Sequence, residues 1–358
     1  MKPAASFGRL ERLLHRFAFA TRRAQLGLAD LEQWLYRKEL QATVVGPSVF
    51  VTALPRAGTT MLLELLAGCP EFATHTYRDM PFVLCPMLWR ALSPRLQRPP
   101  AAQERAHGDG LTIGRDSPEA FEEVLWLAHW RDCYRRDSIA PWPDELRAEF
   151  VEHFASHRRQ IVALRARAEP RARRYLAKNN LHIARLPGLL SAVPDAQVVV
   201  PFREPVQQAA SLLHQHRRFV ALHREDAFAR RYMAGIGHFE FGAELRPVDF
   251  GGWLGGRSLT LAQELPFWLE YWLAAYRHLL PQAGDPRLVL VDFARLATDR
   301  NVGELGARLG VTDVDQLRAQ ASLLRPLPER EVDLAGVAPA LLDAVRTVFA
   351  ELQRLALG

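Results

Sequence analysis

One stretch near the start of the chain limits the fold more than any other. Ser48–Leu54 is an apolar, β-branched run of strand length, and Thr59–Ala67 is apolar at nearly every position. The polar turn Pro55–Thr60 joins them, and Gly68 with Pro70 ends the second segment. A strand that enters a buried helix through a short turn leaves free backbone N–H groups at the helix N-terminus. The helix dipole favours an anion there, usually a phosphate.

This turn differs from the triphosphate-binding pattern G-x-x-x-x-G-K-[ST] at the position that matters most for charge. Aligned on that pattern, Gly58 stands at the second Gly and Thr60 at the Mg²⁺-binding hydroxyl. Thr59 replaces the Lys that neutralises the β- and γ-phosphates, and Arg56 is the one cation in the turn. The residues therefore favour a less charged anion than a nucleoside triphosphate with its metal. The alternative is an ordinary strand-to-helix turn without a ligand.

Composition and charge indicate a globular enzyme more than a binder of nucleic acid. The chain has 358 residues, of which 49% are apolar and 24% charged, enough for one large α/β domain or two smaller ones. The net charge of +6 is spread along the chain, so nucleic-acid binding is not required. We expect no membrane span and no signal peptide. The odd number of cysteines, without metal-ligand spacing, favours a reducing, cytoplasmic location.

Three further runs predict the other strands of a parallel sheet. Arg174–Ala177, Gln197–Phe202 and Arg287–Phe293 are short, apolar and rich in β-branched residues, and a helical pattern follows each. Strands that alternate with helices predict an α/β fold in which helices flank a central parallel sheet. The predicted helices of this domain are Ala120–Trp130, Leu146–Arg167, Ile183–Val193, Val206–Arg218, Pro266–Leu280 and Arg295–Leu309.

Helical extensions flank this α/β domain, which we expect to cover residues 47–312. Residues 1–46 form an N-terminal helical extension, and residues 313–358 are expected to form helices that pack on the same domain. Two segments, near residues 76–140 and 215–266, break the alternation of strands and helices. We expect these insertions to shape the substrate side of the site.

Polar residues follow three of the predicted strands. Arg56 comes after the first, Lys178 after the second and Arg203 after the third, with Ser211 in the second turn of the next helix. In an open parallel sheet, ligands bind outside the carboxyl ends of the strands. These side chains therefore converge on one crevice if the strands are neighbours.

Two motifs at these positions resemble those of the sulfotransferases. The turn is similar to the P-[RK]-[SA]-G-T-T loop that binds 5′-phosphosulfate in that family. Arg203–Pro205, followed by Ser211, is similar to R-[DE]-P with a Ser eight residues after the Arg. Lys178–Asn180 is a looser match to K-[NTD]-P, with Asn180 in place of the Pro. The resemblance covers roughly residues 47–300.

The resemblance implies a three-layer P-loop-like fold and a reaction. The donor would be 3′-phosphoadenosine 5′-phosphosulfate, and its sulfuryl group would pass to a hydroxyl of a carbohydrate, a lipid or another small molecule. The residues that would hold the 5′-phosphosulfate are Arg56, Ala57, Gly58, Thr59 and Thr60. Arg203 and Ser211 would hold the 3′-phosphate, and Arg56 with Lys178 would meet the charge that develops on the leaving phosphate.

A base must take the proton of the acceptor hydroxyl, and the residues leave several candidates. Tyr77 stands nearest the position where the family usually has Glu. We expect Asp79 to be the base, followed by His107 and then by Glu122 or Glu123. A loop-capping role is an equal alternative for Asp79.

Two other functions stay open at this point. The chain could be a nucleotide or small-molecule kinase, or a non-catalytic nucleotide-binding protein of the same fold. We interpret His129 and His182 as core or surface histidines and expect no metal.

Overall fold

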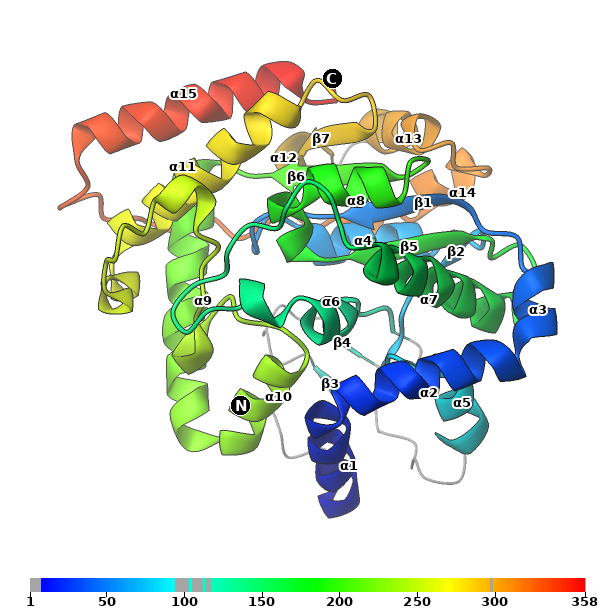
Figure 1. The fold of residues 1–358 in the computed structure, drawn as a ribbon. Coiled ribbons are helices and arrows are strands. Elements are labelled where there is room, and N and C mark those ends of the chain that lie inside the picture. The colour runs from blue at the N-terminus through cyan, green and yellow to red at the C-terminus, as the bar shows by residue number, and fades with distance from the viewer. Residues whose placement is uncertain (1–7, 94–102, 105–111, 114–116, 297–298, 358) are drawn as a thin grey trace.

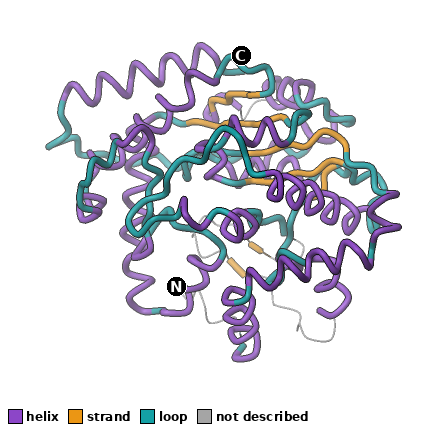
Figure 2. Tube along the Cα trace, viewed as in Figure 1, coloured by secondary structure: helices purple, strands orange, loops and turns teal. Residues whose placement is uncertain are grey.

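Five parallel strands form the central sheet of the protein. The structure, a computed structural model, describes residues 8–93, 103–104, 112–113, 117–296 and 299–357. The strand order across the sheet is β2-β5-β1-β6-β7 (Figures 1 and 2). These strands are β1 (Gly46–Val51), β2 (Phe72–Ala73), β5 (Arg174–Lys178), β6 (Gln197–Phe202) and β7 (Leu288–Asp292). A separate antiparallel pair joins β3 (Gln103–Glu104) to β4 (Thr112–Ile113).

The sheet separates two hydrophobic cores, because side chains along a strand point alternately to opposite faces. Val49 and Val51 of β1 point into one core, whereas Phe50 points into the other. The first core is covered by α4 (Thr59–Ala67), α13 (Asp299–Arg308) and α14 (Val314–Ala319). The second is covered by α6 (Glu123–His129), α7 (Ala148–Ala166), α8 (Leu186–Ala192), α9 (Pro205–Glu225), α11 (Leu265–Leu279) and α15 (Pro339–Leu355). Helices on both faces confirm the predicted three-layer α/β fold.

Strand β1 lies where the chain changes direction across the sheet. It pairs with β5 on one side, with Val51 beside Lys178, and with β6 on the other, with Val51 beside Val199. The chain moves to β2 and β5 on the first side before it returns to β6. In parallel sheets such a switch point opens a crevice at the carboxyl ends of the strands. The loops after β1, β5 and β6 therefore meet at one edge, as expected.

The N-terminal extension lies below the sheet in Figure 1. It contains α1 (Arg9–Ala20), α2 (Arg22–Leu35) and α3 (Arg37–Ala42). Glu32 of α2 is fully buried and accepts the backbone N–H of Leu88, in α5 (Pro86–Leu92), at 2.6 Å. This contact ties the extension to the segment that follows the first β–α unit.

Three stretches differ from the sequence prediction. The helix expected over Ile183–Val193 begins with a 3₁₀ turn at Asn180–Ala184, and α8 starts at Leu186 with Pro187 in its first turn. Helix α9 continues to Glu225 and is followed by α10 (Ala227–Gly235). The tail is not helical throughout, because residues 324–338 run without regular structure and Pro326 and Pro328 lack the N–H that a helix requires.

Candidate functional site

The loop between β1 and α4 has an unusual backbone. Arg56 has a φ of 70° and Gly58 a φ of 92°, both in the left-handed region. A Cβ on Gly58 would lie 2.2 Å from the ring of Phe293, so this position requires Gly. Arg56 is strained there, and strain of this kind concentrates at ligand-binding loops. The first N–H groups of α4 have no partners within the helix, and its N-terminus favours an anion.

Gln208, in α9, is hydrogen-bonded to the backbone of this loop. Its side-chain N–H group donates to the carbonyl oxygens of Leu54 at 3.2 Å and Pro55 at 3.0 Å. Its Oε1 accepts from Nε1 of Trp272 at 3.0 Å, and the whole side chain is buried. Sequence reasoning missed Gln208. The signal was its place three residues before Ser211, which puts both on one face of a helix.

The two motifs that carried the resemblance meet in space. Nε of Arg56 donates to Oγ of Ser211 at 3.2 Å, although the two residues are 155 positions apart. Arg203 follows β6, which pairs directly with β1, and its side chain is buried. Residues from the loop and from the second motif thus share one site.

The tail supplies a third part of this site. Arg203 donates to the carbonyl oxygen of Pro328. Gln207, in the first turn of α9, accepts from the backbone N–H of Arg330 at 2.8 Å and donates to its carbonyl oxygen at 3.0 Å. Nε of Arg330 is buried and has no hydrogen-bond partner among the described residues. A buried donor of this kind suits an anion. No local pattern in the sequence marked Arg330.

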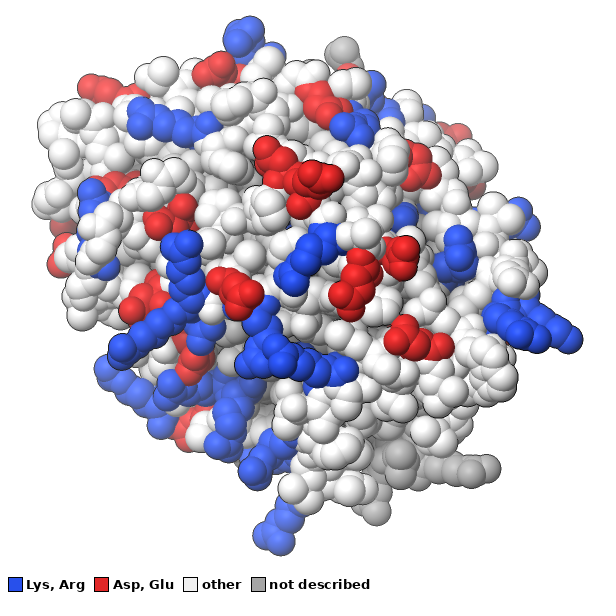
Figure 3. Space-filling model, viewed as in Figure 1, with Lys and Arg blue, Asp and Glu red and all other residues white. Residues whose placement is uncertain are grey.

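The positive charges of Arg56, Arg203 and Arg330 repel one another. Burial, together with Arg56 and Arg330, lowers the pKa of the Arg203 guanidinium below its usual value. Burial lowers the pKa of His214, and it is lowered further by the nearby Arg330, Arg218, Arg56 and Arg217. An anion would relieve this repulsion. Further along α9 and over α10, basic side chains gather on the surface (Figure 3).

Lys178 and Asn180, at and just after the end of β5, bring further polar side chains to the site. Lys178 ends β5 next to β1, and it is buried. Oδ1 of Asn180 accepts from Oγ1 of Thr59 at 3.4 Å, and its Nδ2 donates to Oε1 of Glu240 at 3.1 Å. Glu240 is half-buried and lines a small, mostly apolar cavity with Leu181, Phe239 and Tyr271 among others. Sequence reasoning missed Glu240, which lies 60 positions from Asn180.

Asp79 makes the contacts of a capping carboxylate. It is fully buried at the end of a 3₁₀ turn (Tyr77–Asp79), and Oδ2 accepts the backbone N–H of Thr76 at 2.8 Å. The same oxygen pairs with the guanidinium of Arg165. These contacts are those of the alternative prediction, in which Asp79 caps the loop. His107, the second predicted base, lies outside the described residues.

Glu122 and Glu123 belong to a buried polar network beside β5. Oε1 of Glu122 lies 2.7 Å from Nε2 of His182, and its Oε2 accepts from the Tyr175 hydroxyl at 2.9 Å. Burial raises the pKa of Glu122, but His182 and the hydrogen bonds outweigh it and lower the value to about 2. Glu123 pairs with Arg185 at 2.5 Å and accepts from Asn179 at 2.7 Å. This network positions Asn179, next to Lys178.

Comparison with known proteins defines the class. Residues 47–240 match the model of the Sulfotransferase family, which is more than half of the chain. The chain belongs to the sulfotransferase family, a family of enzymes. No curated protein matches the sequence. Within the described ranges, no helix is both long and apolar enough to cross a bilayer.

One solved structure shows the same fold, and two others are similar to a lesser degree. A sulfotransferase of Mycobacterium avium superimposes with a TM-score of 0.51 at 15% identity, over 92% of this chain and 82% of that one. A sulfotransferase of Mycobacterium tuberculosis gives 0.46 at 16% identity, over 90% and 81%. The sulfotransferase domain of the Synechococcus olefin synthase gives 0.39 at 14% identity, over 86% and 96%.

Proposed function

We propose that this protein transfers a sulfuryl group from 3′-phosphoadenosine 5′-phosphosulfate to a hydroxyl of a carbohydrate, lipid or small-molecule acceptor. The observation that carries the proposal is the contact between Arg56 and Ser211, which joins the anion-binding loop to the second motif. The three free cysteines support a reducing, cytoplasmic location.

The residues fit a ligand with two separate anionic groups. Arg56, with the N-terminus of α4, would hold the 5′-phosphosulfate. Arg203, Ser211 and Arg330 would hold the 3′-phosphate, and the unpartnered Nε of Arg330 is a donor ready for it. A kinase needs a Lys at position 59 for the β- and γ-phosphates, and Thr59 stands there. The donor supplies the sulfuryl group, and the chain supplies the charges around it.

The cations stabilise the charge that forms as the sulfuryl group leaves. Sulfuryl carries less charge than phosphoryl, so fixed cations suit an in-line transfer to the acceptor oxygen. Arg56 is fixed by Ser211, and the backbone of Lys178 is fixed by the pairing of β5 with β1. Both side chains would neutralise the phosphate oxygen from which the sulfuryl group departs. Preorganised charges of this kind need no rearrangement during the reaction.

For the base, we propose Glu240 ahead of Asp79. Glu240 is half-buried at a cavity and reaches Thr59 of the loop through Asn180. Asp79, in contrast, is fully buried in an ion pair. A carboxylate linked to the loop in this way can take the proton of an acceptor hydroxyl that binds beside the loop.

Calorimetry tests the donor. We expect adenosine 3′,5′-bisphosphate to bind the protein, and ATP with Mg²⁺ to bind far more weakly. Arg203→Ala should weaken bisphosphate binding about 10- to 150-fold, because a hydrogen bond to a charged group contributes roughly 1.5–3 kcal/mol. Arg224→Ala, an exposed arginine on the same helix, is the control. Tight binding of ATP without response to the bisphosphate would favour a kinase.

Steady-state kinetics test the base. A panel of hydroxylated acceptors is first screened by mass spectrometry for a sulfated product. With the acceptor so found, Glu240→Gln should lower kcat by about 10²- to 10⁴-fold and leave bisphosphate affinity unchanged. Asp79→Asn should lower the melting temperature, and it should lower kcat much less than Glu240→Gln does. A large loss of kcat in Asp79→Asn, with little loss in Glu240→Gln, would favour Asp79 as the base. Bisphosphate binding without any sulfated acceptor would favour the non-catalytic alternative.

A further inference from the structure

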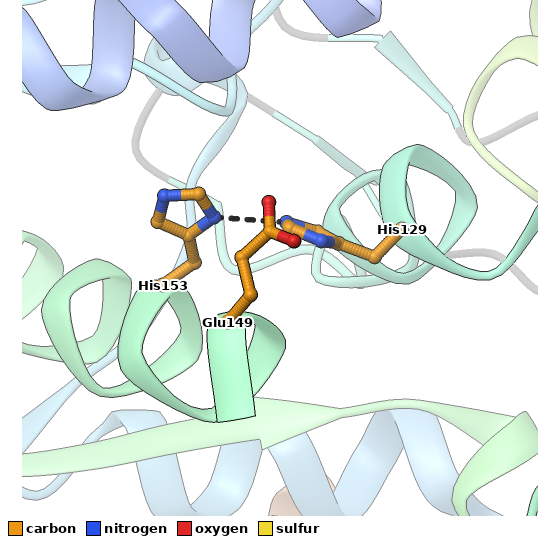
Figure 4. Close-up of side chains that lie close together, drawn as sticks. All are labelled: His129, Glu149 and His153. Carbon is orange, nitrogen blue, oxygen red and sulfur yellow. Dashed lines mark hydrogen bonds between the residues drawn. The ribbon is translucent and has the colours of Figure 1, made fainter. Parts of the chain in front are cut away.

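Two histidines and a glutamate meet on the surface between α6 and α7, apart from the donor site. His129 ends α6, whereas Glu149 and His153 lie one turn apart on α7 (Figure 4). One potential ligand atom from each residue lies within 4.8 Å of the others. Glu149 is exposed, and the two imidazoles are partly buried. None of the three contributes to the sulfuryl-transfer site described above.

The hydrogen bonds of His153 orient its ring. Its Nε2 lies 3.1 Å from Oδ1 of Asp30, in α2, and a carboxylate next to a ring nitrogen holds the proton there. Nδ1 of His153 is therefore left with a lone pair, and it lies 3.1 Å from Nε2 of His129. A carboxylate behind a ligating imidazole is the usual arrangement around protein-bound zinc.

The separation of the ring nitrogens suits a shared ion. Two nitrogens that bind one tetrahedral ion at about 2.0–2.1 Å lie roughly 3.3 Å apart. The observed 3.1 Å between His129 and His153 is close to this value. A single proton between the rings gives a similar distance, and the Glu149 variant described below distinguishes the two arrangements. Two imidazoles with one carboxylate are ligands that zinc prefers, whereas a hydrogen-bonded pair needs no Glu149.

We propose that His129, Glu149 and His153 bind a divalent transition-metal ion of the zinc class, with Asp30 as the positioning residue behind His153. Water would complete the coordination. The ion would join α6 to α7 directly and α2 through Asp30. It would thus fasten the N-terminal extension to the α/β domain, and its role would be structural.

The charges near the site favour a cation. Glu149 and Asp30 bring two negative charges. Arg147 brings one positive charge, and its guanidinium lies 4.0 Å from the centre of the Trp130 ring and donates to the carbonyl oxygen of His129. Arg147 is thus bound to the backbone of His129, whereas the imidazole of His129 contacts His153.

Titration with ZnCl₂ tests the site. The full chain, without any histidine tag, is dialysed against EDTA and then into metal-free buffer. We expect one ion per chain by calorimetry and a rise of a few degrees in the melting temperature at saturation, since an ion that binds the folded state stabilises it. Co²⁺ should give a visible absorption band that Zn²⁺ removes. Cleavage of α1 and α2 by protease should slow when zinc is bound.

Variants locate the ion. Glu149→Gln and Asp30→Asn should each weaken zinc binding about 10- to 100-fold, and His153→Gln by at least as much. Glu152→Gln, an exposed neighbour on the same helix, should leave affinity unchanged. If His153→Gln fails to fold, the exposed Glu149 and Asp30 variants decide. Absence of stoichiometric binding, or equal affinity in Glu149→Gln and Glu152→Gln, would overturn the proposal.

Discussion

At the scale of the residue, the donor loop depends on two backbone conformations that most side chains avoid. Arg56 accepts a left-handed φ that costs on the order of 1–3 kcal/mol, and its cation is thereby directed toward Ser211. Gly58 accepts its own positive φ without that cost, but the Phe293 ring leaves it no room for a side chain. The loop conformation therefore depends on a strained backbone at Arg56 and on the absence of a side chain at Gly58.

Gly58→Ala should destabilise the protein by roughly 2–5 kcal/mol, because it adds both backbone strain and a clash with Phe293. Urea denaturation measures the free energy of unfolding. Gly284→Ala is the matched control, since a Cβ there meets nothing within 4 Å and its φ is not positive. Equal stability of the two variants would contradict the described loop conformation.

At the scale of the element, we expect the contact between α2 and α5 to depend on pH. Burial is the largest influence on Glu32 and raises the pKa of its carboxyl from 4.5 to about 7, although the backbone N–H groups of Leu88 and Met87 oppose it. Between these two values the folded state holds a proton that the unfolded state has released. The free energy of unfolding therefore falls as the pH rises through this window.

Glu32→Gln should remove this part of the pH dependence. The wild type should lose up to roughly 3 kcal/mol between pH 4.5 and 7 from this group, whereas the variant should not. Urea denaturation at a series of pH values, in metal-free buffer, gives the difference curve. The difference in free energy of unfolding between wild type and variant should fall from pH 4.5 to about pH 7 and stay constant above that pH. Parallel curves for the two proteins would show that Glu32 titrates normally.

At the scale of the whole molecule, the donor site combines segments from distant parts of the chain. Residues 328–330 of the tail lie on the start of α9 through Arg203 and Gln207. Behind them, α15 packs Val345, Val348 and Leu352 into the core that contains α11. The tail thus packs on the core beside the sheet and lies at the proposed ligand site.

Arg330→Ala should weaken bisphosphate binding about 10- to 150-fold without loss of stability, since it removes a charged donor from the proposed 3′-phosphate site. Calorimetry at two salt concentrations measures it, and the salt dependence should decrease in the variant. Arg325→Ala, an exposed arginine of the same tail, is the control. If Arg330→Ala binds like wild type, the tail only covers the site.

The sheet and the donor loop were predictable because their signals are local. Buried strands such as Gln197–Phe202 are continuous apolar runs, and the loop from Pro55 to Thr60 is a contiguous motif. Strand β2 has only two residues and leaves no periodic pattern. Arg330 and Glu240 reach the site through folding of segments far apart in sequence. Such contacts are set by tertiary packing, which no local pattern records.

The position of Arg330 has a practical consequence for fragments of this enzyme. The family match ends at residue 240, but β7 and the tail come after it. A protein truncated there would expose the backbone of β6 from Val198 to Phe202 as an unpaired edge, which is prone to aggregation. It would also lack an arginine of the proposed donor site. The minimal expressible unit therefore extends about one hundred residues beyond the recognisable motif region, as far as α15.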